Sequence, residues 1–137
     1  MEFFDAIIRY ETRLWAHLEH TLVDETGGSL AVLEALRVVA DHPGTARVAE
    51  LRRDLGITVG AASKLADRLE RDSLVERRAN PDDRRSSLLE LTAEGRATLA
   101  RDLAIVKRAL AEHLGDVDTS AAVSLVATLS ARFEVAR

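Results

Sequence analysis

Apolar residues recur every three to four positions at both ends of the chain, a period that predicts long amphipathic helices. The first runs from Met1 to about Asp24. Near the other end, Thr92 is expected to cap a long helix that Gly115-Asp116 interrupts, and Asp118 or Thr119 to start a last one. The apolar positions of these stripes are Phe4, Ile7, Ile8, Leu14, Trp15, Leu18 and Leu22, then Leu99, Leu103, Val106, Leu110 and Leu114, then Val123, Val126, Leu129 and Phe133.

Two shorter helical patterns precede the middle of the chain. Ser29 is expected to cap the first, which stops at His42-Pro43-Gly44. The second is shorter and ends near Gly56. Their apolar positions are Leu30, Leu33, Leu36, Val39 and Ala40, then Val48, Leu51 and Leu55.

Beyond Gly56 the pattern predicts a third short helix and then a β-hairpin. Thr58 is a plausible N-cap, and Asp67 and Arg71 are spaced to form a surface ion pair. The buried side is expected to hold Ala62, Leu65, Ala66 and Leu69, and the polar side Gly60, Ser63, Lys64, Arg68 and Arg71. The period then changes to that of strands over Val75 to Arg78 and Ser87 to Leu91, joined by the turn Asn80-Pro81-Asp82-Asp83-Arg84-Arg85.

This order of elements is typical of a winged helix-turn-helix, which places one helix in the major groove of DNA and a hairpin along the backbone. The predicted fold class is mainly α with a small β-hairpin wing (α+β). Residues 29–95 are expected to form the DNA-binding region, and residues 1–28 and 96–137 a helical dimerisation region. One copy has little with which to cover its terminal apolar stripes, so a symmetric dimer with interleaved terminal helices is expected.

The charge of the chain is unevenly distributed. The net charge is −4, but residues 44–92 hold ten basic and nine acidic residues, so the excess of acid lies outside the predicted DNA-binding region. The absence of cysteine excludes disulfides and thiolate metal sites within the sequence. No apolar run approaches the length of a membrane span, so no membrane partner and a cytoplasmic location are expected.

Candidate chemistry is sparse. The sequence lacks a Gly-rich phosphate loop, G-x-S-x-G and H-E-x-x-H, and Asp82-Asp83 lies in a charged turn, so neither an enzyme nor a cofactor is expected. His17 and His20 have a spacing that can bind a metal ion, but no third ligand is obvious and no metal site is expected. Trp15 is either a packing residue or, with His17, part of an effector pocket.

The segment from Gly60 to Thr92 resembles the MarR family of bacterial winged-helix regulators. The matching pieces are Ser63-Lys64, Asp67-Arg68-Leu69, Leu74-Val75-Glu76-Arg77, Asn80-Pro81-Asp82-Asp83-Arg84-Arg85, Leu91-Thr92 and Glu94-Gly95. The resemblance implies a homodimeric regulator, often a repressor, that binds a short palindromic operator. It also implies possible control by a small molecule lodged between the dimerisation helices and the DNA-binding region.

By position, the resemblance implies that Ser63 and Lys64 face bases or phosphates in the major groove. Arg85 would lie at the minor groove with Asp83 bracing it, and Arg84 would reach a phosphate. The expected DNA-binding residues are Thr58, Gly60, Ala61, Ser63, Lys64, Arg68, Asp83, Arg84 and Arg85.

Two positions depart from the family pattern. The family usually has glycine where Ser73 stands, at a left-handed helix end. Gly60 and Ala61 have no side-chain hydrogen-bonding groups, so base readout is expected to depend on few residues and on DNA shape. The alternative function is a winged-helix protein-interaction module without DNA binding, with Lys64 and Arg84-Arg85 as ordinary charged surface.

Overall fold

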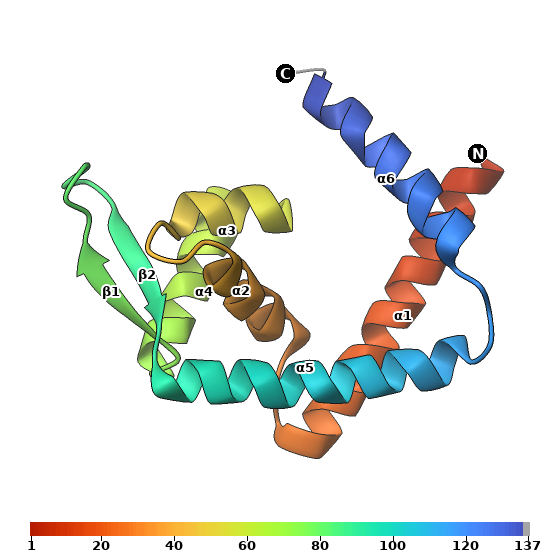
Figure 1. Cartoon of the computed structure of the whole chain (residues 1–137), viewed down its shortest axis with the longest axis horizontal. Coiled ribbons are helices and arrows are strands. Elements are labelled where there is room, and N and C mark those ends of the chain that lie inside the picture. The colour runs from red at the N-terminus through yellow and green to blue at the C-terminus, as the bar shows by residue number, and fades with distance from the viewer. Residues whose placement is uncertain (136–137) are drawn as a thin grey trace.

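The computed structural model describes residues 1–135, with side chains up to Phe133, and these residues form six helices and one antiparallel pair of strands (Figure 1). The mainly α fold with a small hairpin is therefore confirmed. The helices are α1 (Glu2–Thr26), α2 (Leu30–Asp41), α3 (Val48–Leu55), α4 (Val59–Arg71), α5 (Ala93–Leu114) and α6 (Ser120–Val135), and the strands are β1 (Val75–Ala79) and β2 (Ser87–Leu91).

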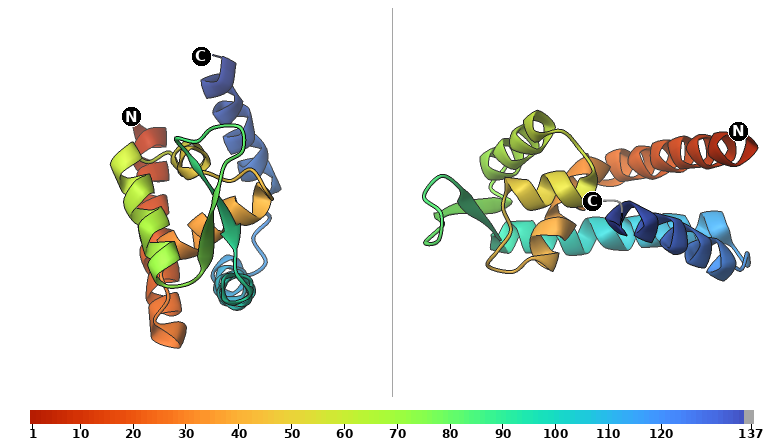
Figure 2. Two further views of the ribbon diagram at one scale, coloured as in Figure 1. Left: turned by 90° about the vertical axis from the view of Figure 1, so that its left-hand side faces the viewer. Right: turned by 90° about the horizontal axis from the view of Figure 1, so that it is seen from above.

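The elements form a compact head and a helical extension. Helices α2, α3 and α4 and the hairpin gather at one end of α5, while α1 and α6 lie toward its other end (Figure 1). Helix α1 crosses α5 at a steep angle, and its N-terminal half extends away from the head (Figure 1, Figure 2). The middle of the chain thus supplies the head, and the two ends supply the extension.

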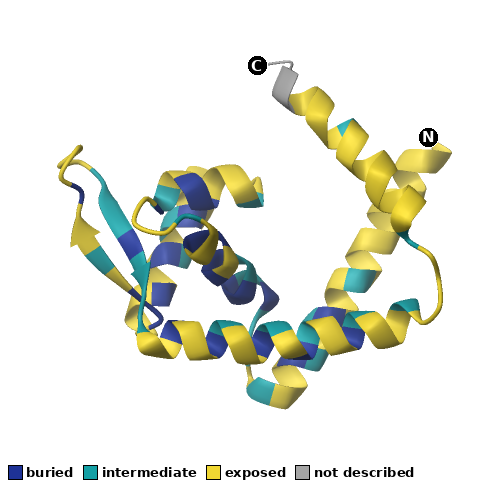
Figure 3. Cartoon of the chain, viewed as in Figure 1, coloured by how far each residue is buried: buried dark blue, intermediate teal, exposed yellow. Residues whose placement is uncertain are grey.

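Two apolar clusters hold these parts together, and buried positions concentrate in the head and at its junction with α1 and α5 (Figure 3). The head cluster joins α2, α3, α4 and both strands through side chains such as Leu36, Leu51, Leu69, Val75 and Leu89. The junction cluster comprises Leu18, Leu22, Leu30, Leu33, Ile105 and Ala109. The head is therefore joined to the C-terminal third of α1 and to the middle of α5.

Side-chain caps explain where α4 and α5 begin. Thr58 and Thr92 each accept a hydrogen bond from an amide of the following turn, at 3.2 Å from Ala61 N and 2.9 Å from Gly95 N, so both predicted caps are confirmed. Ser29 stands at the predicted N-cap position of α2, but its side chain makes no capping hydrogen bond. Instead the α1 carboxylate of Glu19 accepts the amide of Leu30 at 2.6 Å.

The exit from α4 is left-handed. Ser73 has φ 58°, and it is the one non-glycine residue with positive φ among the described residues. The Leu74 amide donates to Leu69 O at 2.8 Å and closes the end of α4. Ser73 thus takes the left-handed position that glycine usually occupies at a helix end. The hydroxyl of Thr92 then donates to Ser73 O at 2.7 Å and fixes the start of α5 against this corner.

The hairpin is anchored at its base. Val75 pairs with Leu91 and Ala79 with Ser87, so β1 is one residue longer than predicted. The Leu89 amide donates to Ala46 O at 2.8 Å, which joins β2 to the α2–α3 connection. The body of the hairpin is therefore held against the head, and its tip projects beyond it.

The ends of the chain expose large apolar side chains. None of the described side chains of α6 is buried, and Val123 and Phe133 are 63% and 78% exposed. On α1, Phe4 and Ile8 are also exposed. The described helices include none with the length and apolar character needed to cross a membrane.

Candidate nucleic-acid interface

Helix α4 has one face in the core and one face in solvent. Ala62, Ala66 and Leu69 are buried, as predicted, and Leu65 is half-buried. On the other side Thr58, Gly60, Ala61, Lys64 and Arg68 are exposed, and Ser63 is half-buried. The structure thus brings the candidate DNA-binding residues of this helix to its solvent side.

An arginine on the hairpin fixes α4 to the wing. Arg77 on β1 pairs with Asp67, and its Nε lies 3.0 Å from Glu70 Oε2, both on α4. The predicted pair between Asp67 and Arg71 is therefore wrong, and Arg71 instead lies 3.6 Å from Asp72. Local helical spacing could not reveal the arginine of a neighbouring strand that competes for the carboxylate.

The wing tip is a hydrogen-bonded turn. Asn80 is buried, its Nδ2 donates to Ser86 Oγ at 2.9 Å, and its Oδ1 accepts the Asp82 amide at 3.0 Å. Asp83 Oδ1 accepts the Arg85 amide at 2.9 Å. Asp83 therefore braces the backbone of Arg85, which leaves the guanidinium groups of Arg84 and Arg85 in solvent.

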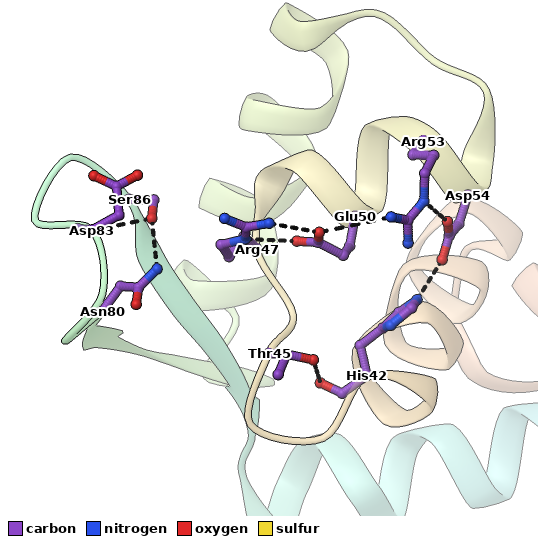
Figure 4. Close-up of polar contacts among 9 residues, drawn as sticks. All are labelled: His42, Thr45, Arg47, Glu50, Arg53, Asp54, Asn80, Asp83 and Ser86. Atoms are coloured by element: carbon purple, nitrogen blue, oxygen red, sulfur yellow. Dashed lines mark hydrogen bonds and ion pairs between the residues drawn. The ribbon is translucent and has the colours of Figure 1, made fainter. Parts of the chain in front are cut away.

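Paired charged groups lie along α3 and join it to the end of α2 (Figure 4). Arg47 donates two hydrogen bonds to Glu50, at 3.0 and 2.9 Å, and Arg53 Nε donates to Asp54 at 2.7 Å. Asp54 Oδ2 also lies 2.6 Å from Nε2 of His42 at the end of α2. The hydrogen bond from Arg47 lowers the pKa of Glu50, and that from Arg53 lowers the pKa of Asp54.

Ion pairs change the charge balance of residues 44–92. Six of the ten basic residues there have a carboxylate oxygen within 4.0 Å, namely Arg47, Arg53, Arg68, Arg71, Arg77 and Arg78. Among the side chains of residues 1–133, no carboxylate lies that close to the other four, namely Arg52, Lys64, Arg84 and Arg85. The cations left for a ligand are thus on α3, on α4 and at the wing tip.

A hollow of about 700 Å³ separates α1 from α4. It brings the effector candidate Trp15 together with two DNA-binding candidates, Lys64 and Arg68, and its apolar wall includes Leu55, Ile57 and Leu65. His17 is not part of it, because its ring lies 5.8 Å from that of His113 on α5. His20 pairs with Asp24, and no group of three potential metal ligands gathers within the described part of the chain.

Sequence reasoning missed the roles of Arg47, Arg52, Arg53 and Arg77. All four were visible as basic residues, but their pairing depends on which carboxylates the fold brings near them. Among the described side chains, Arg52 is left unpaired because the structure pairs Glu50 with Arg47 and Asp54 with Arg53.

Comparisons with known proteins agree with this geometry. Residues 27–86 match the family model described as MarR family. The transcriptional regulator HosA of Escherichia coli O111:H- is 36% identical over 100 residues, which cover 73% of this chain and 71% of that protein.

Solved structures give the same fold over nearly the whole chain. Sco3205 of Streptomyces coelicolor, a MarR family transcriptional regulator solved in complex with DNA, has a TM-score of 0.81 at 25% identity, over 96% of this chain and 83% of its own. BpsR of Bordetella bronchiseptica, whose DNA binding is regulated by 6-hydroxynicotinic acid, has a TM-score of 0.78 at 21% identity, over 93% and 90%.

Proposed function

We propose that this chain, which belongs to the MarR family of DNA-binding transcriptional regulators, is a repressor. In this proposal it acts as a homodimer and binds a palindromic operator. The observation that carries the proposal is the distribution of unpaired cations. After ion pairing, Lys64, Arg84 and Arg85 remain without carboxylates among the side chains of residues 1–133, and they lie on the two elements that a winged helix-turn-helix presents to DNA. Such a protein acts where the DNA is, in the cytoplasm.

Helix α4 is the recognition helix of the proposal. Lys64 on its solvent side reaches guanine acceptors in the major groove, and Ser63 contacts bases or phosphates beside it. Gly60 and Ala61 allow the helix to approach closely, and capping by Thr58 fixes its first turn. Arg68 has a weaker claim, because its Nε lies 3.6 Å from Asp72.

The wing makes the second contact. Arg85 enters or lines the minor groove, Arg84 reaches a phosphate, and Asp83 holds the turn that presents them. Because Arg77 ties β1 to α4, the wing and the recognition helix approach DNA as one rigid unit.

A second copy of the chain is the proposed partner of the terminal helices. The exposed apolar side chains of α1 and α6 belong to residues 1–28 and 96–137, and a single copy does not cover them. Interleaving these helices in a two-fold dimer buries the apolar faces of α1 and α6. It also places two heads, each formed by residues 29–95, so that each binds one half of a palindromic operator. The last two residues of the dimerisation region lie outside the described residues.

The hollow beside Trp15 is the proposed effector site. Its apolar wall suits a small flat organic molecule, and Lys64 and Arg68 in its lining suit an acidic group on that molecule. The two carboxylates of the lining, Glu34 and Asp54, are paired with Arg37 and Arg53. The proposal is supported by BpsR, a protein of the same fold that 6-hydroxynicotinic acid regulates. A ligand there would contact Lys64 directly and release the operator by occupying a side chain that DNA needs.

An electrophoretic mobility shift with DNA from upstream of the gene tests the function. The expected result is a discrete complex that survives competition by excess unrelated duplex. Failure to bind any duplex at low salt would favour the alternative, a protein-interaction module without DNA binding.

A further inference from the structure

Helix α3 lies on the same side of the head as the wing tip (Figure 1). Arg47, Arg52 and Arg53 line a hollow of about 540 Å³ along this helix. Glu50 is the one carboxylate among its lining residues. The lining therefore holds three guanidinium groups against a single carboxylate.

The carboxylates near this hollow are already engaged. The side chain of Glu50 is only 10% exposed, and both its oxygens accept hydrogen bonds from Arg47 (Figure 4). Asp54 is likewise held by Arg53 and His42. Neither acid is free to neutralise a third arginine, so a positive charge remains on this surface.

That charge is on Arg52. Its side chain is exposed and has no carboxylate within 4.0 Å among the side chains of residues 1–133. Its backbone, in contrast, is fixed, because its carbonyl accepts the amides of Gly56 and Ile57 at the end of α3. A firmly placed backbone with an unpaired guanidinium suits the capture of an external anion.

We propose that Arg52 binds a phosphate of the DNA backbone, as a third contact besides α4 and the wing. The inference rests on the proposed function and extends its DNA footprint to α3. In a helix-turn-helix the helix before the recognition helix crosses the backbone, and α3 occupies that position. Phosphates are regularly spaced along the duplex, and guanidinium binds them with two parallel hydrogen bonds.

The test compares Arg52→Gln with Arg71→Gln in fluorescence anisotropy across a salt series. Arg71 is the matched control, because it is an exposed arginine of the same head that already has a carboxylate beside it. Arg52→Gln should weaken operator and scrambled duplexes alike, by about tenfold per subunit near 0.1 M salt. It should also reduce the slope of log affinity against log salt by about 0.9 per subunit, and Arg52→Lys should restore most of that slope.

The outcomes separate this proposal from the function on which it rests. If wild-type protein binds DNA and Arg52→Gln behaves like Arg71→Gln, the phosphate contact is refuted and the function stands. If wild-type protein binds no DNA, both are refuted. A loss confined to the operator would also refute the proposal, since a phosphate contact carries no sequence information.

Discussion

A β-carbon on Gly95 would lie 1.9 Å from the carbonyl oxygen of Leu74, at the corner where the hairpin and α5 meet. The amide of Gly95 donates to Thr92 Oγ1, and the Thr92 amide donates to Leu74 O at 3.1 Å. Thr92 and Gly95 together therefore allow the start of α5 to pack directly against the backbone of Leu74.

Gly95→Ala should destabilise the protein strongly. The methyl group would meet main-chain atoms, which cannot rotate away, so we expect a decrease of about 3 kcal/mol or more in the free energy of unfolding. Chemical denaturation measures it. Gly60→Ala is the control, because a β-carbon there meets nothing within 4 Å, and it should stabilise by about 0.5–1 kcal/mol.

Ser73→Gly should stabilise the protein by about 1 kcal/mol, because it relieves a side chain held at φ 58°. Ser73→Ala should change little, since alanine has the same β-carbon in the same backbone conformation. Thermal denaturation of the three proteins separates these effects. Equal stability of the serine and glycine forms would show that position 73 carries no strain.

Glu50 should contribute to the acid sensitivity of the fold. Its pKa is lowered from the ordinary 4.5, mainly by the hydrogen bond from Arg47. A lowered pKa stabilises the folded state fully above that ordinary value, and the stabilisation disappears as pH falls through the folded pKa. Glu50→Gln should therefore cost about 1 kcal/mol at pH 7, and this cost should shrink as pH falls below 4.5 and disappear once Glu50 is protonated in the folded state. Urea denaturation at each pH measures this cost. Glu34→Gln is the control, because Glu34 pairs with Arg37 but is more exposed than Glu50.

Lys64→Ala and Arg85→Ala should weaken DNA binding in different ways. A lysine at base edges contributes about 1–3 kcal/mol on the operator and much less on random DNA. Arg85→Ala should weaken operator and scrambled duplexes alike, and it should flatten the salt dependence by about one unit for each phosphate that the arginine no longer neutralises. Anisotropy titrations on both duplexes distinguish the two patterns. Equal weakening of both duplexes by Lys64→Ala would identify Lys64 as a phosphate-binding residue.

The proposed dimer makes a prediction about mass. Light scattering after size exclusion should give about twice the chain mass of 15.0 kDa at micromolar concentration. Truncation before Thr119 removes α6 and should cause aggregation, because the apolar face of α1 is then left uncovered. A cooperative, fully folded monomer would contradict the dimer.

Local sequence signals predicted the elements because their boundaries are set by nearby residues. Thr58 and Thr92 cap helices within their own first turns, and the strands follow from a change of period. Glu19 was missed as a cap because it acts on Leu30 from another helix.

The candidate site was predictable only in part. The basic residues of α4 and the wing were evident from the pattern, but the sequence could not show which arginines are neutralised. Arg77 is paired across elements with Asp67, and only the folded arrangement reveals that pairing. The same arrangement leaves Arg52 without a carboxylate among the side chains of residues 1–133, although it is one of two adjacent arginines in the sequence.

The bonds within the wing tip bear on the conformational entropy of DNA binding. Asn80, Asp83 and Ser86 fix the turn before any ligand arrives. Fixing the backbone of one residue costs roughly 1–2 kcal/mol, and a flexible tip would incur that cost at each contacting residue on meeting the duplex. Here the backbone is ordered when the chain folds, so Arg84 and Arg85 have only side-chain freedom to lose when they bind.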